Sequence, residues 1–376
     1  MGYRKYITRI DQIPELDNLN EQQKQTLNSV VKRYAFRTNE YYQSLIDWED
    51  PDDPIRRIVI PSADELEPWG KLDASGESRY ARAPGLEHKY ADTAVLLVSD
   101  VCGALCRFCF RKRLFMDDNQ EVSRDVSAGL AYIRRHPEIN NVLVTGGDPL
   151  LLSTRRLTEI VEQLRAIDHV RIIRIGSKMP AFNPFRILDD PDLLRMFKTH
   201  SRPDRRIYLM AQFNHPRELT EEARRALDMV QQSGVCIMHQ TPMIRGVNDD
   251  PTTLGELFNE LSYLGVAPYY LFQCRPTEGN AAYTVPIEEG YQIFAEALKT
   301  CSGLARRCRY TMSHATGKIE VAGLTAERIF FRFHRPADSE QSLSNLLVCA
   351  RNPKACWLDD YAEAKSPLRL ARNSFH

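Results

Sequence analysis

Short apolar runs alternate with amphipathic stretches of helical length over much of the chain. Six five-residue runs, several of them rich in β-branched residues, have the character of buried parallel strands: 95–99, 141–145, 171–175, 207–211, 235–239 and 269–273. Stretches with helical periodicity follow at 122–135, 154–166, 190–199, 218–233, 251–264 and 287–298. This alternation predicts an α/β fold in which a parallel sheet curls into a partial (β/α)6 barrel.

The ends of the chain have a different character. The first part is polar and charged, with a helical patch at 21–42 and an acidic linker at 47–53. Ser62 and Glu65 have the spacing of a capping box, which predicts a short helix there. Residues 318–321 and 329–333 alternate like antiparallel strands. We therefore expect a helical N-terminal extension (1–93), the barrel (94–300) and a small α+β C-terminal segment (301–376).

Composition excludes several classes of protein. Lys+Arg and Asp+Glu both number 50, so the net charge at pH 7 is zero with neutral histidines, and no global charge favours nucleic acid or an anionic membrane. No apolar run approaches the roughly 20 residues that span a bilayer, and the first residues do not resemble a secretory signal. Nine cysteines in such a chain favour a reducing compartment and metal or redox use. We expect a cytoplasmic protein without nucleic-acid or membrane partners.

Three of the cysteines lie at C-x3-C-x2-C spacing directly after the first predicted strand: Cys102, Cys106 and Cys109. The carboxyl ends of parallel strands are where α/β barrels place their chemistry. Three thiolates can hold three corners of a four-iron cluster, whereas a fully ligated cluster needs four, so one iron would stay open to a ligand. The alternatives are a zinc site, which usually needs four ligands, or buried structural thiols. The flanking Arg107 and Arg111-Lys112-Arg113 favour a wet, cationic mouth over a core.

The cysteine stretch and the basic residues after it resemble the lysine 2,3-aminomutase family of radical S-adenosylmethionine enzymes. The resemblance covers roughly residues 58–335. It implies a 4Fe-4S cluster on the three cysteines, S-adenosylmethionine and pyridoxal 5′-phosphate. In the implied reaction, a radical from S-adenosylmethionine removes a hydrogen from an amino acid, whose amino group moves from carbon 2 to carbon 3. The expected partners are a small-molecule amino acid and a reductant such as flavodoxin or ferredoxin, and we expect a homo-oligomer.

The resemblance also implies contacts with S-adenosylmethionine. Gly146, Gly147 and Asp148 follow the second strand, and paired glycines let the backbone approach a ligand closely, although such residues also mark ordinary turns. They match the glycine-rich element that contacts the methionine amino group. Other matches to cofactor positions lie at later strand ends, namely Ser177, Gln212, where the family often has histidine, and Gln240. His215 could bind a ligand or cap a helix.

Lys318, within Gly317-Lys318-Ile319, is the candidate Schiff-base lysine for pyridoxal phosphate. A lysine with an ordinary pKa of about 10.4 needs a dry or cationic setting to react; the alternative is a lysine that protects a strand edge. Lys89 and Tyr90 match family positions near this cofactor. Thr93 stands where the family often has an arginine, which implies that the phosphate has one cation fewer.

The substrate-side residues depart from the lysine-using members. Arg111 matches the arginine that pairs with the substrate α-carboxylate, which suits its bidentate geometry. Arg275 and Thr311 stand where lysine-using members have aspartates. A substrate ammonium beside Arg275 would be repelled and poorly compensated for lost water, so we expect a glutamate-like or neutral polar side chain instead of lysine. The alternative is that Arg275 turns away and pairs with Glu278.

Further cysteines leave other possibilities open. Two C-x6-C pairs could hold zinc or an auxiliary cluster, as some family members bind zinc near the C-terminus: Cys301, Cys308, Cys349 and Cys356. Cys236 and Cys274 are predicted to be packed thiols. Two alternative functions remain, a radical S-adenosylmethionine enzyme that runs another reaction without pyridoxal phosphate, and an iron–sulfur protein without turnover.

Overall fold

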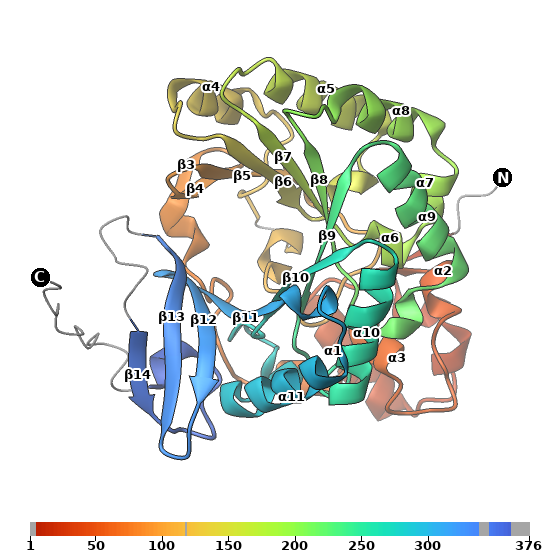
Figure 1. Ribbon diagram of the computed structural model, residues 1–376. Helices are drawn as coiled ribbons and strands as arrows, with labels where there is room; N and C mark the ends of the chain where they lie inside the picture. Colours follow the sequence, from red (N-terminus) through yellow and green to blue (C-terminus); the bar gives the residue numbers. More distant parts are fainter. Residues whose placement is uncertain (1–4, 117–118, 338–345, 362–376) are drawn as a thin grey trace, which may run out of the picture.

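The computed structural model describes residues 5–116, 119–337 and 346–361, and twelve of the described strands form one curved sheet in which neighbours in sequence are neighbours in space. Figure 1 shows the sheet with helices on its outer side. The parallel part contains the six predicted strands, so the partial-barrel prediction is confirmed. They are β5 (Thr93–Ser99), β6 (Asn141–Gly146), β7 (Ile172–Ser177), β8 (Ile207–Ala211), β9 (Cys236–Pro242) and β10 (Ala267–Phe272).

A seventh parallel strand, β11 (Arg309–His314), was not predicted. It pairs with β10 in parallel and with β12 (Gly317–Leu324) antiparallel. The predicted antiparallel strands are confirmed as β12 and β13 (Arg328–Pro336), and β14 (Leu346–Ala350) adds an edge. At the opposite edge, β3 (Ala81–Ala83) and β4 (Leu86–Tyr90) pair antiparallel. Because β4 pairs with β5 and β10 with β11, one sheet crosses both predicted segment boundaries.

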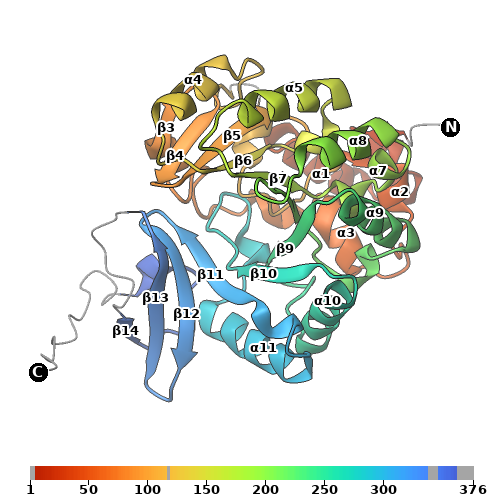
Figure 2. The ribbon, with the colours of Figure 1, turned by 45° about the horizontal axis from the view of Figure 1, so that its top comes forward.

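The predicted helices form because each has an apolar face that packs on the sheet. In α9 (Glu221–Gln232), Thr220 caps the first turn, and Ala223, Ala226, Leu227 and Val230 are buried at helical spacing. Figure 2 shows the helices following the curve of the sheet. The others predicted from periodicity are α4 (Ser127–Arg135), α5 (Thr154–Arg165), α8 (Pro191–His200), α10 (Pro251–Tyr263) and α11 (Ile287–Thr300).

The N-terminal extension is more broken than its pattern predicts. The helical patch splits into α1 (Glu21–Arg33), a short strand β2 (Thr38–Asn39) and α2 (Glu40–Gln43). α3 (Pro54–Val59) follows the acidic linker. The predicted capping box of Ser62 and Glu65 is present at η3 (Ala63–Leu66), a single 3-10 turn. Packing against the barrel, described below, explains the breaks.

The two flanks of the sheet are joined by side chains, across what we call the seam. Here β13 and the β11–β12 turn face β4 and the segment before β3, which contains the 3-10 turn η4 (Glu77–Tyr80). The contacts are Arg335 Nη2 to Thr93 Oγ1 (2.7 Å) and to Asp92, Lys89 Nζ to the His314 carbonyl, Tyr80 Oη to the Ala315 carbonyl (2.7 Å) and Ser75 Oγ to the Ser313 carbonyl (2.7 Å).

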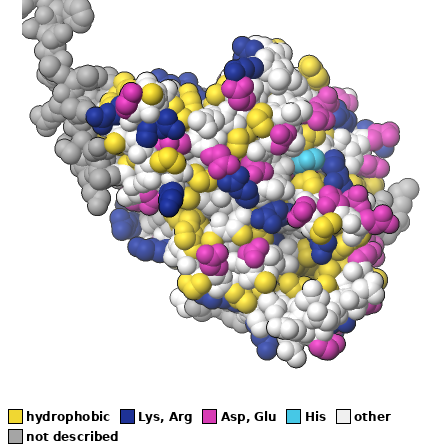
Figure 3. Space-filling model, turned by 90° about the horizontal axis from the view of Figure 1, so that it is seen from below, with side chains coloured by type: hydrophobic (Ala, Val, Ile, Leu, Met, Phe, Trp, Pro, Cys, Tyr) yellow, Lys and Arg dark blue, Asp and Glu magenta, His cyan; other side chains and the backbone are white. Residues whose placement is uncertain are grey.

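The surface agrees with the balanced composition. Figure 3 shows acidic and basic side chains interspersed over one face. Among the described residues, every helix is too short or too polar to serve as a membrane span.

Candidate active site

The three cysteines lie on residues 100–111, here called the cysteine loop, which leaves the carboxyl end of β5. The N-terminal extension holds this loop through hydrogen bonds to its backbone. They are Asn39 Nδ2 to the Gly103 carbonyl (3.1 Å), the Leu105 amide to the Arg37 carbonyl (2.8 Å) and the Arg107 amide to the Ile58 carbonyl (2.8 Å). The extension therefore shapes the loop, a role that the sequence did not indicate.

Arg107 does not line a wet mouth, which corrects the prediction for this residue. Its guanidinium is buried and pairs with Glu65, Nε to Oε1 at 2.9 Å and Nη2 to Oε2 at 2.8 Å, and Nη1 donates to the Ala35 carbonyl at 2.8 Å. The Arg107 side chain is 2% exposed and that of Glu65 is 0% exposed. These contacts join the cysteine loop to η3 and to the segment that follows α1.

We expect Glu65→Gln to destabilise the protein strongly. Removing one partner of a buried ion pair leaves an uncompensated charge and costs about 3–5 kcal/mol. The measurement is the free energy of unfolding from urea titration. Glu296→Gln is the matched control, because Glu296 pairs with Lys299 at an exposed site and such pairs contribute about 0–1 kcal/mol. Equal effects of the two substitutions would contradict the clamping role.

The three cysteines are half-buried, and cations lie near their thiols. Burial raises the pKa of each, that of Cys106 to about 12, while Lys178, Arg37 and Lys112 lie near enough to lower it. Cations around sulfur suit an anionic iron–sulfur cluster, whose ligands are thiolates. In the described ranges, no three His, Cys, Asp or Glu side chains are arranged so that together they could hold one metal ion. In a cluster each cysteine binds a different iron, so the thiols need not converge on one point.

The glycine-rich segment lies directly against the cysteine loop. Gly146 has a φ of +120°, and a Cβ on Gly147 would lie 2.5 Å from the Val101 carbonyl oxygen. Both positions therefore require glycine for packing of the two strand ends. Asp148 accepts from Ser177 Oγ at 2.9 Å and from the Lys178 amide at 2.8 Å, and burial raises its pKa to about 6. Four predicted cofactor residues are thus brought together beside Cys102.

A buried ion pair next to Cys106 was missed by the sequence analysis. Lys178 Nζ lies 2.6 Å from both Glu218 Oε1 and Asn214 Oδ1. Gln212 Nε2 donates to the same Asn214 oxygen at 3.1 Å, while Gln240 lies on β9, half-buried. His215 accepts from the Arg217 amide at 3.2 Å and so acts as a cap.

Lys318 is half-buried and lies near two aromatic rings. Its Nζ lies 4.8 Å from the ring centroid of Tyr270 and 4.7 Å from that of Phe272, and 3.2 Å from Ser313 Oγ. Burial lowers the pKa of Lys318 to about 7, helped by nearby Arg275, Arg174 and Lys89. Aromatic rings and neighbouring cations thus provide a setting that favours the neutral, reactive form of the lysine.

Two arginines that the sequence analysis did not assign lie near this lysine. Arg335, on β13, donates to Thr93 Oγ1 and lies 4.4 Å from the Tyr90 ring centroid. It therefore supplies a cation at Thr93, where the sequence predicted one to be missing. Arg174, on β7, donates to Asn141 Oδ1 at 2.8 Å. Arg174 could have been recognised from the sequence, because it is a charged residue inside an apolar strand. Arg335 gave no such signal, because it lies beyond the predicted end of its strand.

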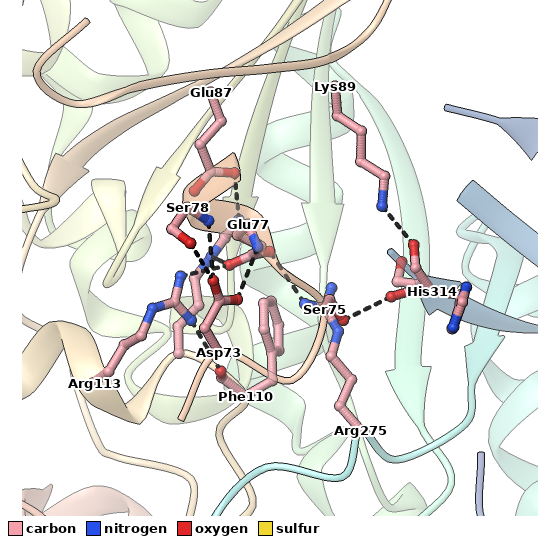
Figure 4. A network of polar contacts seen from close by, with 12 residues as sticks. Asp73, Ser75, Glu77, Ser78, Glu87, Lys89, Phe110, Arg113, Arg275 and His314 are labelled. Carbon is pink, nitrogen blue, oxygen red and sulfur yellow. Dashed lines mark hydrogen bonds and ion pairs between the residues drawn. The ribbon is translucent and has the colours of Figure 1, made fainter. Parts of the chain in front are cut away.

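Three arginines converge on Glu77, a residue that the sequence analysis overlooked (Figure 4). The contacts are Arg111 Nε to Oε2 (3.1 Å) and Nη2 to Oε1 (3.2 Å), Arg113 Nη2 to Oε2 (2.8 Å) and Arg275 Nη1 to Oε1 (3.1 Å). Although burial opposes it, these cations lower the pKa of Glu77 well below its usual range. The alternative partner of Arg275, Glu278, instead binds Arg33 at 2.6 Å.

Unsatisfied polar atoms lie beside this cluster. Within the described ranges, Thr311 Oγ1 and Glu87 Oε1 are buried without a hydrogen-bond partner. Burial raises the pKa of Glu87 to about 7, and the charge of Glu77 adds to this. Arg275 stacks on Phe110, with Cζ 3.7 Å from the ring centroid, and its hydrogen bonds to described residues involve Nη1 alone. Nε and Nη2 of Arg275, whose side chain is 16% exposed, therefore have no hydrogen-bond partner among the described residues.

The predicted second metal site is not supported. In the described part of the chain, no three His, Cys, Asp or Glu side chains are placed so that they could hold one metal ion, and this includes the four cysteines. Cys301, Cys308 and Cys349 are buried in the C-terminal core, and Cys301 Sγ donates to the Ala297 carbonyl at 3.3 Å. Cys356 Sγ donates to the Lys354 carbonyl at 3.5 Å. The three buried thiols of the C-terminal core serve packing, as does the buried Cys274.

The sequence is similar to a known superfamily and to several known enzymes. Residues 96–254 match the Radical SAM superfamily. A "Putative L-lysine 2,3-aminomutase" of Aquifex aeolicus (strain VF5) is 59% identical over 96% of this chain and 95% of its own length. The L-lysine 2,3-aminomutase of Clostridium subterminale is 36% identical over 77% of this chain and 69% of its own. The glutamate 2,3-aminomutase of Clostridioides difficile (strain 630) is 32% identical over 80% and 70%. The chain belongs to the lysine 2,3-aminomutase family of radical S-adenosylmethionine enzymes.

Proposed function

We propose that this protein is a pyridoxal phosphate-dependent 2,3-aminomutase that acts on an amino acid other than lysine, with a carboxylate or neutral polar side chain. The observation that carries the proposal is Lys318, a half-buried amine of lowered pKa near the Tyr270 and Phe272 rings. It lies at the start of β12, at the edge of the sheet where the cysteine loop begins. An iron–sulfur protein without turnover would not need such a lysine.

The residues present fit both cofactors. Bound pyridoxal phosphate supplies a carbonyl that holds an amino group covalently, and the reduced cluster with S-adenosylmethionine supplies a radical that removes hydrogen. Cys102, Cys106 and Cys109 would hold the cluster, and the region around Asp148 and Ser177 would hold S-adenosylmethionine. The cations that would hold the phosphate are Lys89, Arg174 and Arg335, close to Tyr90 and Lys318.

The protein's own groups have distinct roles in this scheme. Lys318 presents a neutral amine, because burial and neighbouring cations remove its proton near pH 7. Arg111 orients the amino acid through its carboxylate, although Glu77 already engages its Nε and Nη2. The aromatic rings of Tyr270 and Phe272 exclude water from the lysine.

The substrate side favours an acidic amino acid. Nε and Nη2 of Arg275 form a planar edge that can donate two hydrogen bonds to a carboxylate, and Thr311 Oγ1 is a further partner. The relative named glutamate 2,3-aminomutase supports this class, while several others are named for lysine. A reductant such as flavodoxin or ferredoxin, and a homo-oligomeric state, belong to the same proposal.

Anaerobic turnover of isotopically labelled amino acids tests the proposal. With reconstituted cluster, S-adenosylmethionine, pyridoxal phosphate and reductant, we expect a β-amino product from glutamate or a similar substrate. Its formation should also require pyridoxal phosphate. Formation of 5′-deoxyadenosine without any β-amino product would favour another radical reaction.

Covalent capture of pyridoxal phosphate should depend on pH through Lys318. Its pKa of about 7 lies below the ordinary lysine value of 10.5, so the reactive neutral amine is present above pH 7 and is lost as pH falls below it. Borohydride trapping, followed by peptide mass spectrometry, should rise between about pH 6 and 8 and then level off. Burial has the largest effect on the pKa of Lys318; the charged groups that modify it are Arg275, Arg174 and Lys89, which lower it, and Glu77, which raises it.

Lys318→Arg is the control for this measurement, since arginine cannot form the trapped bond. Trapping that rises only near pH 10, or labels another lysine, would contradict the assignment.

A further inference from the structure

We infer that Glu77 is a positioning residue, which fixes the guanidinium of Arg275 in the direction that a substrate side-chain carboxylate must meet. The inference rests on the proposed function and deepens it. It concerns how the site selects an acidic substrate. A flexible arginine side chain does not by itself hold its guanidinium in one orientation.

The first support is the shared carboxylate. Glu77 joins Arg111 and Arg113, which follow the cysteines, to Arg275, which follows β10. Its side chain is only 11% exposed. Because three charge-assisted contacts meet on one buried carboxylate, each guanidinium has a defined position relative to the others.

The second support is that the backbone of Glu77 is itself held in place. Asp73 accepts from the amides of Glu77 (2.8 Å) and Ser78 (3.0 Å), which caps η4. The same segment is anchored where it crosses the strand ends, because the Lys71 amide donates to the Pro276 carbonyl at 3.0 Å. The Ser75 and Tyr80 contacts across the seam add to this. These contacts fix the position from which the Glu77 side chain reaches the arginines.

The third support is the part of Arg275 that stays available. Phe110 stacks beneath the guanidinium plane and Glu77 holds Nη1. These two contacts determine both the plane of the group and its rotation within that plane. The edge formed by Nε and Nη2 therefore faces one direction, suited to a planar carboxylate.

Two substitutions separate geometry from charge. Glu77→Asp keeps the negative charge but withdraws the carboxylate by one methylene, so Arg275 loses its orientation while the net charge is unchanged. Losing one charge-assisted hydrogen bond of about 1.5–3 kcal/mol weakens binding roughly tenfold or more. Glu77→Gln keeps the length and removes the charge. Glu121→Asp is the matched control, because Glu121 pairs with Arg113 and not with Arg275.

The measurement is calorimetric affinity for glutamate and for glutamine, using protein loaded with cluster, S-adenosylmethionine and pyridoxal phosphate but without reductant. We expect Glu77→Asp to weaken glutamate binding about tenfold more than glutamine binding, because any loss through Arg111, which Glu77 also holds, is common to both amino acids. Glu121→Asp should stay within twofold of wild type for both. Unchanged binding by Glu77→Asp together with tighter binding by Glu77→Gln would overturn the inference, because Glu77 would then only screen charge. A wild type that does not prefer glutamate would overturn the substrate class, and this inference with it.

Discussion

Alanine in place of Cys102, Cys106 or Cys109 should abolish cleavage of S-adenosylmethionine. Each thiolate holds one iron of the proposed cluster, and the open fourth iron is the position to which S-adenosylmethionine would bind. A cluster with two protein ligands would be lost or would expose more than one iron. The measurement is 5′-deoxyadenosine formed under dithionite, with iron and sulfide content determined on the same sample.

Cys236→Ala is the matched control, since Cys236 begins β9 at the opposite end of the strands from the cysteine loop. This variant should keep wild-type iron content and cleavage. If a cysteine-loop variant retained both iron and cleavage, the assignment of that cysteine would be wrong.

Replacing Arg275 by aspartate should shift selectivity away from acidic substrates. The substitution removes the two free donors of the guanidinium and places a second carboxylate beside Glu77. Charge-assisted hydrogen bonds contribute about 1.5–3 kcal/mol each, so we expect kcat/KM for glutamate to fall roughly ten- to a hundredfold. Rejection of lysine should relax at the same time, because the repulsion of its ammonium disappears.

Steady-state turnover of glutamate, aspartate, glutamine and lysine measures this change. The double variant Arg275→Asp with Thr311→Asp should accept lysine better than the single variant. Two carboxylates offset the free-energy cost of removing water from the substrate ammonium more completely than one does. Arg33→Asp is the control, as Arg33 forms a partly exposed pair with Glu278. A wild type that prefers lysine, or a profile that Arg275→Asp leaves unchanged, would show that Arg275 does not contact the side chain.

The parts of the fold that depend on local pattern were predictable. Buried parallel strands are short apolar runs, and helices such as α9 carry their apolar face at fixed spacing, so both are visible within about a dozen residues. β11 was missed because polar residues such as Arg309, Thr311 and Ser313 interrupt its pattern. Its place depends on pairing with β10 and β12, which lie elsewhere in the chain.

The candidate site was predictable where a spacing carries chemistry, as in the cysteine loop. It was not predictable where distant residues meet. Arg335 contacts Thr93 across 242 positions, and Arg275 contacts Glu77 across 198. Glu65 and Glu77 lie in polar segments whose composition is that of any surface turn, and only the fold shows that they are buried beside arginines.

Because of the seam, some parts of the molecule resist local unfolding less than others. Elsewhere in the barrel, adjacent strands are joined by backbone ladders that part only cooperatively. Between β13 and β4, separation breaks only a few side-chain hydrogen bonds, each contributing about 0.5–1.5 kcal/mol. Amide protons of β7 and β8 should therefore exchange with solvent only through near-global opening, whereas those of the β11–β12 turn and of the segment before β3, which lie outside the strand ladders, should exchange through frequent small excursions.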